Sequence, residues 1–436
     1  MSFPNVGLFF VVFRKNCFER IEMEAELRDQ VQAVGVDESL VELCAQVAHP
    51  FKERSAKYDR EGSFPVENFA ELREAGLYGI MVPKEFGGLG ADFLTYTKAI
   101  EQIGKADSST GLTFNMHNIT IGSVAELELE LQAVGGTRGR TMGEFREWMY
   151  DQAIREKKLF ASAVSEPGIG AHFSKLKTTY KRVDGGYLIN GTKWFVSMAG
   201  YASYYVVAAR NEKSPPDDPS LSYLVVEKEN PGIRIDHVWD TLGMRGTMSD
   251  TMHLTDVFVP TERLFLGSEG MVLYKITREP HWLVGGFTGV YLGICTAAFE
   301  FMVDYLQTKK IPGTDRPMSS DARIQQRVGE LGIQLEAART VTYEAAKLVV
   351  EKRGSLEANS AIHRAKYMCG ELGPHLASMA IRTCGGSTIA RRLPLERYYR
   401  DARCGGLMPA TSDECLMYVG KAMLGIDVSK TSETYW

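Results

Sequence analysis

The sequence predicts an α+β fold with an N-terminal helical domain, a middle β-barrel or sandwich domain and a C-terminal four-helix bundle. Two observations support this prediction. Apolar residues recur at helical spacing from residue 22 to about residue 157, and again after residue 270. Between these stretches, short runs rich in Val, Ile, Tyr and Thr are separated by Asp-Gly-Gly, Asn-Gly and Asn-Pro-Gly turns. We therefore expect a tail at 1–21 and domains at 22–157, 158–270 and 271–436.

The N-terminal domain begins with "DESLVELCAQVAHPF", where an Asp-Glu-Ser cap precedes apolar residues at helical spacing. "PVENFAELREAGLYGIMV" has the same pattern, with Pro65 at the start of a helix. "PKEFGGLGADFLTYTKAIEQIGKAD" predicts a glycine loop followed by another amphipathic helix. The charged, partly glycine-rich segment 126–158 is expected to hold a surface loop between helices.

The middle domain is predicted from runs of β-forming residues that are bounded by turns. These runs are "KTTYKRVDGGYLINGTKWFVS", "YYVVAARN", "LSYLVVEKE", "IRIDHVW" and "MHLTDVFVP". "NEKSPPDDPSLS" is expected to be a polar loop. The chain shows no strand–helix alternation and no GxGxxG motif after a strand, so a Rossmann domain is not expected.

The C-terminal domain returns to the helical period with "WLVGGFTGVYLGICTAAFEFMVDYLQTKK". Gly285, Gly289 and Gly293 are spaced by four in this run, and small residues on one stripe allow a second helix to approach closely. Two further long amphipathic segments and "CLMYVGKAMLG" complete a bundle of about four helices.

Composition and charge exclude several classes of function. The formal net charge is -5 and the pI is about 6.0, so no basic surface is available to neutralise nucleic-acid phosphates. The seven cysteines are scattered, without a Cys-x-x-Cys pair, and no His cluster has metal-ligand spacing. This pattern indicates reduced intracellular thiols, with neither a disulfide framework nor a metal site, and we expect a cytoplasmic protein.

The N-terminal run "NVGLFFVVF" is apolar but too short to span a bilayer. It has no basic residue before it and no small-residue cleavage site after it, which argues against a signal peptide. The absence of acidic residues before Glu19 leaves an organellar presequence open, although a plain tail or a misassigned start is favoured. No other run is expected to reach membrane length.

Three short motifs suggest a ligand site, although each also has a structural explanation. In "ASAVSEPGIGAHF", Ser165, Gly168 and Gly170 offer a hydroxyl and backbone N–H groups that suit a phosphate or a ring carbonyl; an ordinary turn between domains has the same composition. In "GTKWFVSMAG", Trp194 is followed by the hydroxyl of Ser197, so the indole either stacks on a ring or packs in the core. "LGMRGTMSD" adds a glycine turn with an arginine.

Taken together and in order, six motifs between about residues 40 and 425 resemble the acyl-CoA dehydrogenase family of FAD enzymes. "VSEPGIGAHF" resembles the flavin loop Thr-Glu-Pro-Gly-x-Gly-Ser-Asp of that family, and "INGTKWFVS" resembles its Asn-Gly-x-Lys-x-Trp-Ile-Thr strand. The other four are "VPKEFGGLG", "LGMRGTMSDTMHLTDVFVP", "GVYLGICTAAFEFMVDYL" and "CGGSTIARRLPLERYYRDAR".

The resemblance implies an FAD between the β domain and the bundle, with its tail reaching a neighbouring subunit of a homodimer or homotetramer. It also implies removal of a proton α to a thioester carbonyl, transfer of the β-hydride to flavin N5, and re-oxidation by an electron-transferring flavoprotein. The matching positions imply contacts with the isoalloxazine ring, the diphosphate or the partner's FAD. They are Ser162, Val164, Ser165, Gly170, Ala171, Trp194, Val196, Ser197, Lys309, Arg382, Gly385, Gly386, Thr411 and Asp413.

Several of these positions depart from the family pattern. Lys309 stands where an Arg is usual, which keeps the charge but loses the planar fork, and Arg382 replaces a Gln. Ala171 and His172 replace the usual Ser and Asp, so a hydroxyl contact to the diphosphate or the pantetheine is lost and a titratable group is added.

The usual catalytic base of the family is absent. Its Glu belongs to a Tyr-Glu-Gly-Thr tetrapeptide after Arg-Asp-Ala, and Pro409 occupies that position here. Some branches place the base at the start of the glycine-rich helix, which corresponds without gaps to Leu283. Glu279 is our candidate base, the alternative being a carboxylate that satisfies a helix N-terminus. His281 is a second candidate, either as base or as a polar contact to substrate, whereas Glu414 is expected to be solvated or structural.

Three functions therefore stay open. The favoured one is an acyl-CoA dehydrogenase of an atypical branch that lacks the usual C-terminal Glu. The second is a flavin-dependent oxidase or monooxygenase that acts on a substrate without CoA, because relatives of this kind lose or replace the same Glu. The third is a non-catalytic flavin-binding subunit.

Overall fold

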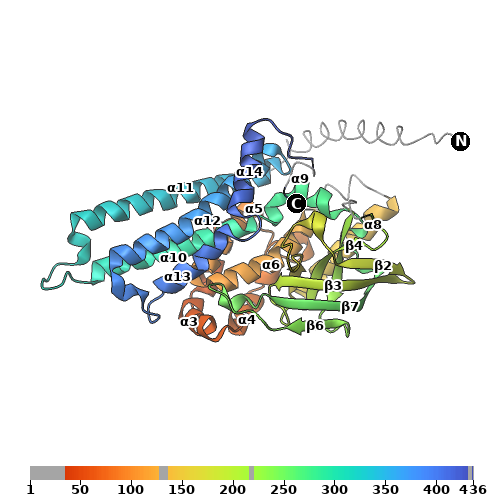
Figure 1. Cartoon of the computed structure of the whole chain (residues 1–436), viewed down its shortest axis with the longest axis horizontal. Coiled ribbons are helices and arrows are strands. Elements are labelled where there is room, and N and C mark those ends of the chain that lie inside the picture. The colour runs from red at the N-terminus through yellow and green to blue at the C-terminus, as the bar shows by residue number, and fades with distance from the viewer. Residues whose placement is uncertain (1–34, 127–135, 216–219, 431–434, 436) are drawn as a thin grey trace. The chain divides into compact units, whose positions relative to one another are not determined.

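The computed structural model describes residues 35–126, 136–215, 220–430 and 435. The chain divides into two units, Met1–Val36 and Asp37–Trp436, and the second contains all the elements that follow. The tail expected at 1–21 lies outside the described residues. Helices, then strands, then helices follow one another along the second unit, which confirms the predicted fold class (Figure 1).

The N-terminal region is helical, as predicted. Asp37 caps the first of its helices by accepting a hydrogen bond from the N–H of Leu40, and Pro65 precedes the third. Of the segment expected to hold a surface loop, 136–154 is helix and 127–135 lies outside the described residues. The helices are α2 (Glu38–Ala48), α3 (Phe51–Glu61), α4 (Val66–Glu74), α5 (Phe93–Ala106), α6 (Ser108–Ala125) and α8 (Gly136–Ile154).

The middle region is a single curled sheet of seven strands in the order β1-β4-β2-β3-β7-β6, with β5 on β4. The predicted Asp-Gly-Gly turn joins β2 to β3 as an antiparallel pair, and β1 runs parallel to β4. The sequence analysis did not predict β1, which lies just before the flavin loop motif. The strands are β1 (Phe160–Ala163), β2 (Thr179–Val183), β3 (Gly186–Val196), β4 (Tyr204–Asn211), β5 (Leu221–Glu227), β6 (Ile233–Asp236) and β7 (Asp250–Pro260).

The C-terminal region is built on three long helices with shorter ones around them (Figure 1). The predicted glycine stripe is confirmed as a helix contact: a Cβ on Gly289 or Gly293 would lie within 2.6 Å of backbone atoms of α5. Side chains there would push the two helices apart. The helices are α9 (Val272–Arg278), α10 (Gly286–Thr308), α11 (Ala322–Lys352), α12 (Leu356–Cys384), α13 (Leu395–Arg403) and α14 (Ser412–Met423).

The segment Pro280–Thr308, which contains α10, is long and apolar enough to cross a membrane. The expectation that no run reaches membrane length is therefore wrong for this segment. Its most apolar window is 89% buried inside the protein. That burial is typical of a core helix, and α10 packs against α5 and α12.

The pair Arg400-Asp401 joins three parts of the fold. The guanidinium of Arg400 donates to both carboxylate oxygens of Asp59 on α3, at 2.8 and 2.7 Å. The Asp401 carboxylate accepts the N–H of Met244 at 2.7 Å and also bonds the hydroxyl of Ser108. Burial raises the pKa of Asp401 to about 6. These contacts hold the C-terminal end of α13 against α3, α6 and the turn at Met244, and so fix where the following loop begins.

Candidate functional site

The flavin loop motif follows strand β1 and is tied to the end of β3. The N–H of Trp194 donates to the carbonyl of Ser165 at 2.7 Å. The ammonium of Lys193 donates to the carbonyl of Val164 at 3.1 Å and to the carboxylate of Glu166 at 2.7 Å. The structure therefore brings the predicted residues of the loop and of the strand into direct contact.

Lys193 and Glu166 form a fully buried ion pair, with side-chain exposures of 0% and 3%. Glu166 also accepts backbone N–H groups from Lys177 and Thr178 at 2.7 and 3.0 Å. Burial lowers the pKa of Lys193 to about 8, against the opposing attraction of Glu166. Because each charge is matched and hydrogen-bonded, the pair fixes the conformation of the loop.

Two aromatic side chains stand exposed at the end of β3. Trp194 and Phe195 are 39% and 51% exposed, and their rings stack with centroids 5.1 Å apart. The prediction chose Trp194 as the ring-stacking residue, but the Asn-Gly-x-Lys-x-Trp pattern quoted for the family puts its Trp at Phe195. The backbone of Phe195 is left-handed, with φ of 55°, and this turns both rings outward.

Val196 and Ser197 point the other way. Val196 is fully buried, and the hydroxyl of Ser197 is paired with the hydroxyl of Ser249 at 2.9 Å. Their contact with a cofactor stays a prediction, since in this structure both side chains belong to the core of the sheet.

The surroundings of this loop fit a flavin. Gly168 and Gly170 have positive φ values of 80° and 59°, and no atom lies within 4 Å of the place where a Cβ would stand. The N–H of Gly170 is already bonded to the carbonyl of Glu166 at 3.1 Å, so the two glycines offer space for a close approach of a ligand to the backbone; Ala171 beside them is half-exposed. The exposed rings of Trp194 and Phe195 suit stacking on a flat ring system, and the accessible backbone of the loop suits the polar edge of that ring system.

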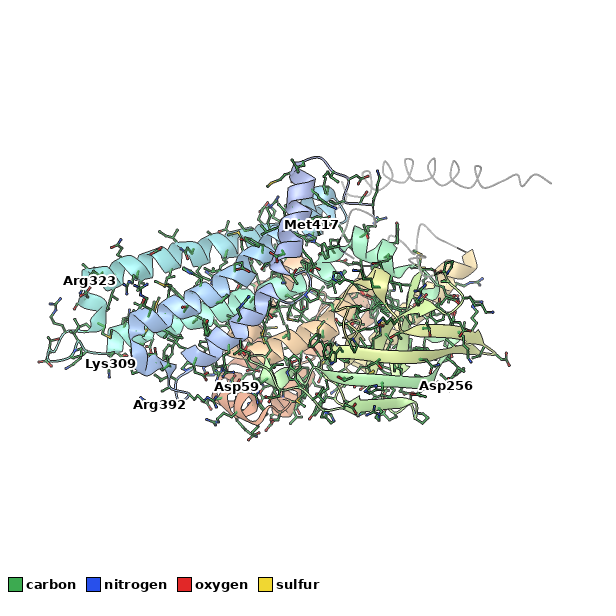
Figure 2. The ribbon with its side chains drawn as sticks, viewed as in Figure 1. Asp59, Asp256, Lys309, Arg323, Arg392 and Met417 are labelled. Atoms are coloured by element: carbon green, nitrogen blue, oxygen red, sulfur yellow. The ribbon has the colours of Figure 1, made fainter. Side chains whose placement is uncertain are left out.

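A second set of predicted cofactor residues lies at the C-terminal ends of α10 and α12. Lys309 is the C-cap of α10, and Gly385 is the C-cap of α12, next to Gly386. Figure 2 shows Lys309 at the end of the bundle remote from the sheet. About 35 Å of helix separates Lys309 from the start of α10. The structure therefore groups Lys309, Arg382 and the two glycines at a separate position, where no Cβ on either glycine would meet an atom within 4 Å.

Thr411 and Asp413 stand at the start of α14. The hydroxyl of Thr411 accepts the N–H of Glu414, and the carboxylate of Glu414 accepts the N–H of Thr411 at 2.7 Å, a capping box. Asp413 is exposed in the first turn. Glu414 therefore has a structural role, as predicted, and the hydroxyl of Thr411 already has a partner.

The loop that contains Pro409 is held by one buried lysine. The ammonium of Lys366 donates to the carbonyls of Gly405, Met408 and Ala410 at 2.7, 3.2 and 2.9 Å. Burial lowers the pKa of Lys366 to about 8. Gly405 packs against the ring of Tyr291, so the glycines of this loop serve packing between helices. The loop predicted to correspond to the family's base loop is therefore held in place, and it has Pro409 where a carboxylate was expected.

Replacing Lys366 with Met is expected to destabilise the protein by about 3 kcal/mol, because three carbonyls lose a charged donor. The unfolding free energy from urea titration is the measurement. The matched control is Lys347→Met, which removes an exposed lysine from α11. An equal, small effect of both variants would show that the loop does not depend on Lys366.

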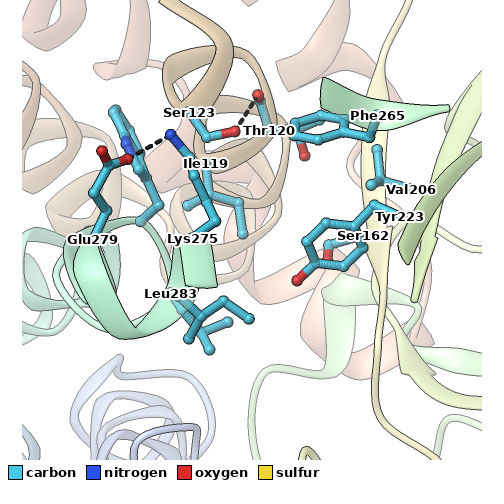
Figure 3. A pocket seen from close by; sticks show the side chains of 12 residues that line it. Ile119, Thr120, Ser123, Ser162, Val206, Tyr223, Phe265, Lys275, Glu279 and Leu283 are labelled. Carbon is cyan, nitrogen blue, oxygen red and sulfur yellow. Dashed lines mark hydrogen bonds and ion pairs between the residues drawn. The ribbon is translucent and has the colours of Figure 1, made fainter. Parts of the chain in front are cut away.

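A cavity of about 60 Å³ lies between β1, β5, α6 and α9 (Figure 3). Its walls are mostly apolar, and its polar end carries the carboxylate of Glu279 and the ammonium of Lys275. Ser162 of β1 is on the opposite side (Figure 3). The lining residues are Ile119, Thr120, Ser123, Ser162, Val206, Tyr223, Phe265, Lys275, Ile276, Glu279, Trp282 and Leu283. The cavity thus adjoins the strand that leads into the flavin loop.

Glu279 lies at the C-cap of α9 and is 2% exposed. Its carboxylate is 2.5 Å from the ammonium of Lys275 and 3.7 Å from the guanidinium of Arg353. Burial alone would raise the pKa of Glu279, but the two cations outweigh it and lower the pKa to about 2. The alternative role at a helix N-terminus holds in position only: Glu279 is the N-cap of the 3-10 helix Pro280–Trp282, but its side chain accepts no capping hydrogen bond there, and α10 begins only at Gly286. Glu279 is a buried carboxylate that faces a cavity.

His281 is fully buried but does not line the cavity. Its Nε2 is 2.9 Å from the carboxylate of Glu126, which also accepts the indole N–H of Trp282 at 2.7 Å. Arg353 donates to the carbonyl of Glu126 at 2.7 Å. His281 therefore packs behind Glu279 and bonds Glu126. Its side chain does not line this cavity, so its predicted role as base or substrate contact stays a prediction.

Sequence reasoning missed three residues of this cluster. Lys275 is four residues before Glu279, so the i, i+4 spacing of a Lys–Glu pair was a usable signal. Glu126 and Arg353 come from the ends of α6 and α11, and no local pattern connects them with the segment around residue 279.

Three domain models of one family match the chain in order. The acyl-CoA dehydrogenase N-terminal domain matches residues 37–127, the middle domain 161–257 and the C-terminal domain 286–424. Fold and site together define a flavin-dependent oxidoreductase with a helical, a sheet and a bundle domain. The chain belongs to the acyl-CoA dehydrogenase family, and its cofactor is FAD.

Known proteins similar to the chain include enzymes of two kinds. The mitochondrial short-chain specific acyl-CoA dehydrogenase of Mus musculus is 29% identical over 82% of each chain. The structure of butyryl-CoA dehydrogenase from Megasphaera elsdenii has a TM-score of 0.76 at 25% identity and covers 90% of this chain and 100% of its own. FMN-bound TdsC from Paenibacillus sp. A11-2, a dibenzothiophene monooxygenase, has a TM-score of 0.78 at 25% identity, covering 90% and 99%.

Proposed function

We propose that this protein is an acyl-CoA dehydrogenase in which Glu279 replaces the missing base at Pro409. The observation that supports this most is geometric: the buried carboxylate of Glu279 lines a cavity that also touches Ser162, three residues before the flavin loop residue Ser165. A buried carboxylate that faces a ligand cavity is the geometry a general base needs.

In this proposal Glu279 removes the proton from the carbon α to the thioester carbonyl. The pair of electrons left on that carbon forms the new double bond as the hydride leaves the β-carbon. FAD, when bound, supplies the acceptor for that hydride at N5. Lys275 and Arg353 keep the carboxylate charged before the reaction, and the apolar walls exclude water. Trp194 and Phe195 hold the ring system against the loop.

The distribution of cofactor residues supports a homodimer or homotetramer. Lys309 lies at the end of the bundle remote from the sheet that carries the flavin loop, about 35 Å of helix from the start of α10, and Arg382, Gly385 and Gly386 lie at the C-terminal end of α12. Residues this far apart serve two cofactors more readily than one, so this second group is assigned to the FAD of a neighbouring subunit. In this proposal an electron-transferring flavoprotein accepts the electrons of the reduced FAD.

Anaerobic titration of the purified yellow protein with a panel of acyl-CoAs tests the proposal. Loss of flavin absorbance, with formation of an enoyl-CoA, is the expected result. Full absorbance after every thioester in the panel would overturn it.

The second candidate is a flavin monooxygenase or oxidase that acts on a substrate without CoA. Two observations favour it: Pro409 in the position of the usual base, and the fold similarity to the monooxygenase TdsC. Turnover that requires oxygen and reduced flavin, with no bleaching by acyl-CoA, would identify this function. A protein that binds flavin and shows neither activity would match the third, non-catalytic function.

A further inference from the structure

The ammonium of Lys275 has unused hydrogen-bonding capacity inside the cavity. Its Nζ is buried, and the contact with Glu279 at 2.5 Å is its one charged contact in the described part of the chain. A lysine ammonium has three N–H donors, and one contact leaves two. Figure 3 shows the ammonium of Lys275 turned toward the carboxylate of Glu279 at one end of the cavity, across from Val206 and Tyr223.

Buried N–H groups without acceptors are costly, and more so on a charged group. Most of the other lining is apolar, from Ile119 and Val206 to Phe265 and Leu283. An alkyl chain that fills this cavity leaves two donors of Lys275 without acceptors. A chain with an oxygen at the right place satisfies them.

We propose that Lys275 is a specificity-determining residue that selects acyl chains with a neutral acceptor oxygen, a hydroxyl or a carbonyl, within a few carbons of the α-carbon. This inference rests on the proposed function of Glu279 as base. The inference goes beyond that proposed function because it names the class of acyl chain that the site selects.

The position of that oxygen follows from two distances. A base lies about 3–3.5 Å from the carbon it deprotonates, and an N–H···O bond spans about 3 Å. Because the ammonium of Lys275 is 2.5 Å from Glu279, an oxygen bonded to Lys275 lies close to the reacting carbons and not at the end of a long chain.

The charges of the cluster favour a neutral oxygen over a carboxylate. Among the described residues that face Glu279, Lys275 and Arg353 are cations and Glu126 is a second anion, with His281 beside it. Two cations therefore already balance two carboxylates. A third carboxylate, from the substrate, would be buried without a partner charge, which is strongly unfavourable.

The test compares flavin reduction in the holoenzyme by butanoyl-CoA, 4-hydroxybutanoyl-CoA and succinyl-CoA under anaerobic conditions. We expect kcat/KM for the hydroxy compound to exceed that for butanoyl-CoA by about tenfold or more, with succinyl-CoA slowest. Lys275→Met is expected to bring the hydroxy and alkyl compounds to within about twofold of each other, and Lys275→Arg to keep the preference.

Lys347→Met is the matched control, because Lys347 and Glu351 form an exposed pair with the same i, i+4 spacing. It is expected to behave as the wild type. Flavin content and thermal unfolding check that each variant is folded. Three results would overturn the inference and leave the proposed function standing. They are equal rates for the butanoyl and hydroxybutanoyl thioesters in the wild type, a preference for the hydroxy compound that survives in Lys275→Met, and a fastest rate with succinyl-CoA. No reduction by any thioester would overturn both.

Discussion

Replacing Glu279 with Gln is expected to slow flavin reduction by acyl-CoA by about 10²–10⁴-fold. The amide has nearly the shape of the carboxylate but cannot accept the α-proton. Stopped-flow absorbance of the flavin under anaerobic conditions is the measurement. Binding of FAD is expected to be preserved, because Glu279 is separated from the loop contacts of Ser165 and Glu166.

Glu351→Gln is the control for this experiment. It makes the same chemical change in the partly exposed Lys347–Glu351 pair on α11, neither residue of which lines the cavity. Its rate of flavin reduction is expected to equal that of the wild type. If Glu279→Gln also reduces its flavin at the wild-type rate, Glu279 is not the base.

Replacing Lys193 with Met is expected to lower the free energy of unfolding by about 3 kcal/mol or more and to weaken FAD binding. The change leaves the carboxylate of Glu166 buried without its cation, in the middle of the flavin loop. It also removes the donor to the carbonyl of Val164. Urea unfolding and the flavin-to-protein ratio after purification measure the two effects.

Lys228→Met is suitable as the comparison, since Lys228 makes an exposed contact of 3.6 Å with Glu229 in the same region. Exposed pairs of this kind contribute between zero and about 1 kcal/mol. A Lys193→Met protein as stable and as yellow as Lys228→Met would contradict the role given to the buried pair.

Most of the fold was predictable because its signals are local. The Asp-Gly-Gly turn between β2 and β3 and the stripe of Gly289 and Gly293 on α10 are spacings that the sequence displays directly. Strand β1 was missed because it has four residues, runs parallel to β4 and adjoins a glycine loop, so it has no hairpin partner nearby.

The candidate site was predictable only in part. Motif spacing found the flavin loop and the absence of a base at Pro409, and it selected Glu279. The cations that lower the pKa of Glu279 are Lys275 on α9 and Arg353 at the end of α11, and only Lys275 is close to Glu279 in the sequence. Glu126 and Arg353 are 227 residues apart and meet only in the folded chain. Likewise, nothing near Lys366 in the sequence indicates that its ammonium holds the loop of Pro409.

A structure of the holoenzyme with a bound acyl-CoA tests the central claim most directly. The measurement is the distance from each polar side chain to the α-carbon of the thioester. The proposal predicts a carboxylate oxygen of Glu279 within about 3–3.5 Å of that carbon, opposite the flavin ring. An α-carbon beyond the reach of Glu279 and next to a different side chain would contradict it.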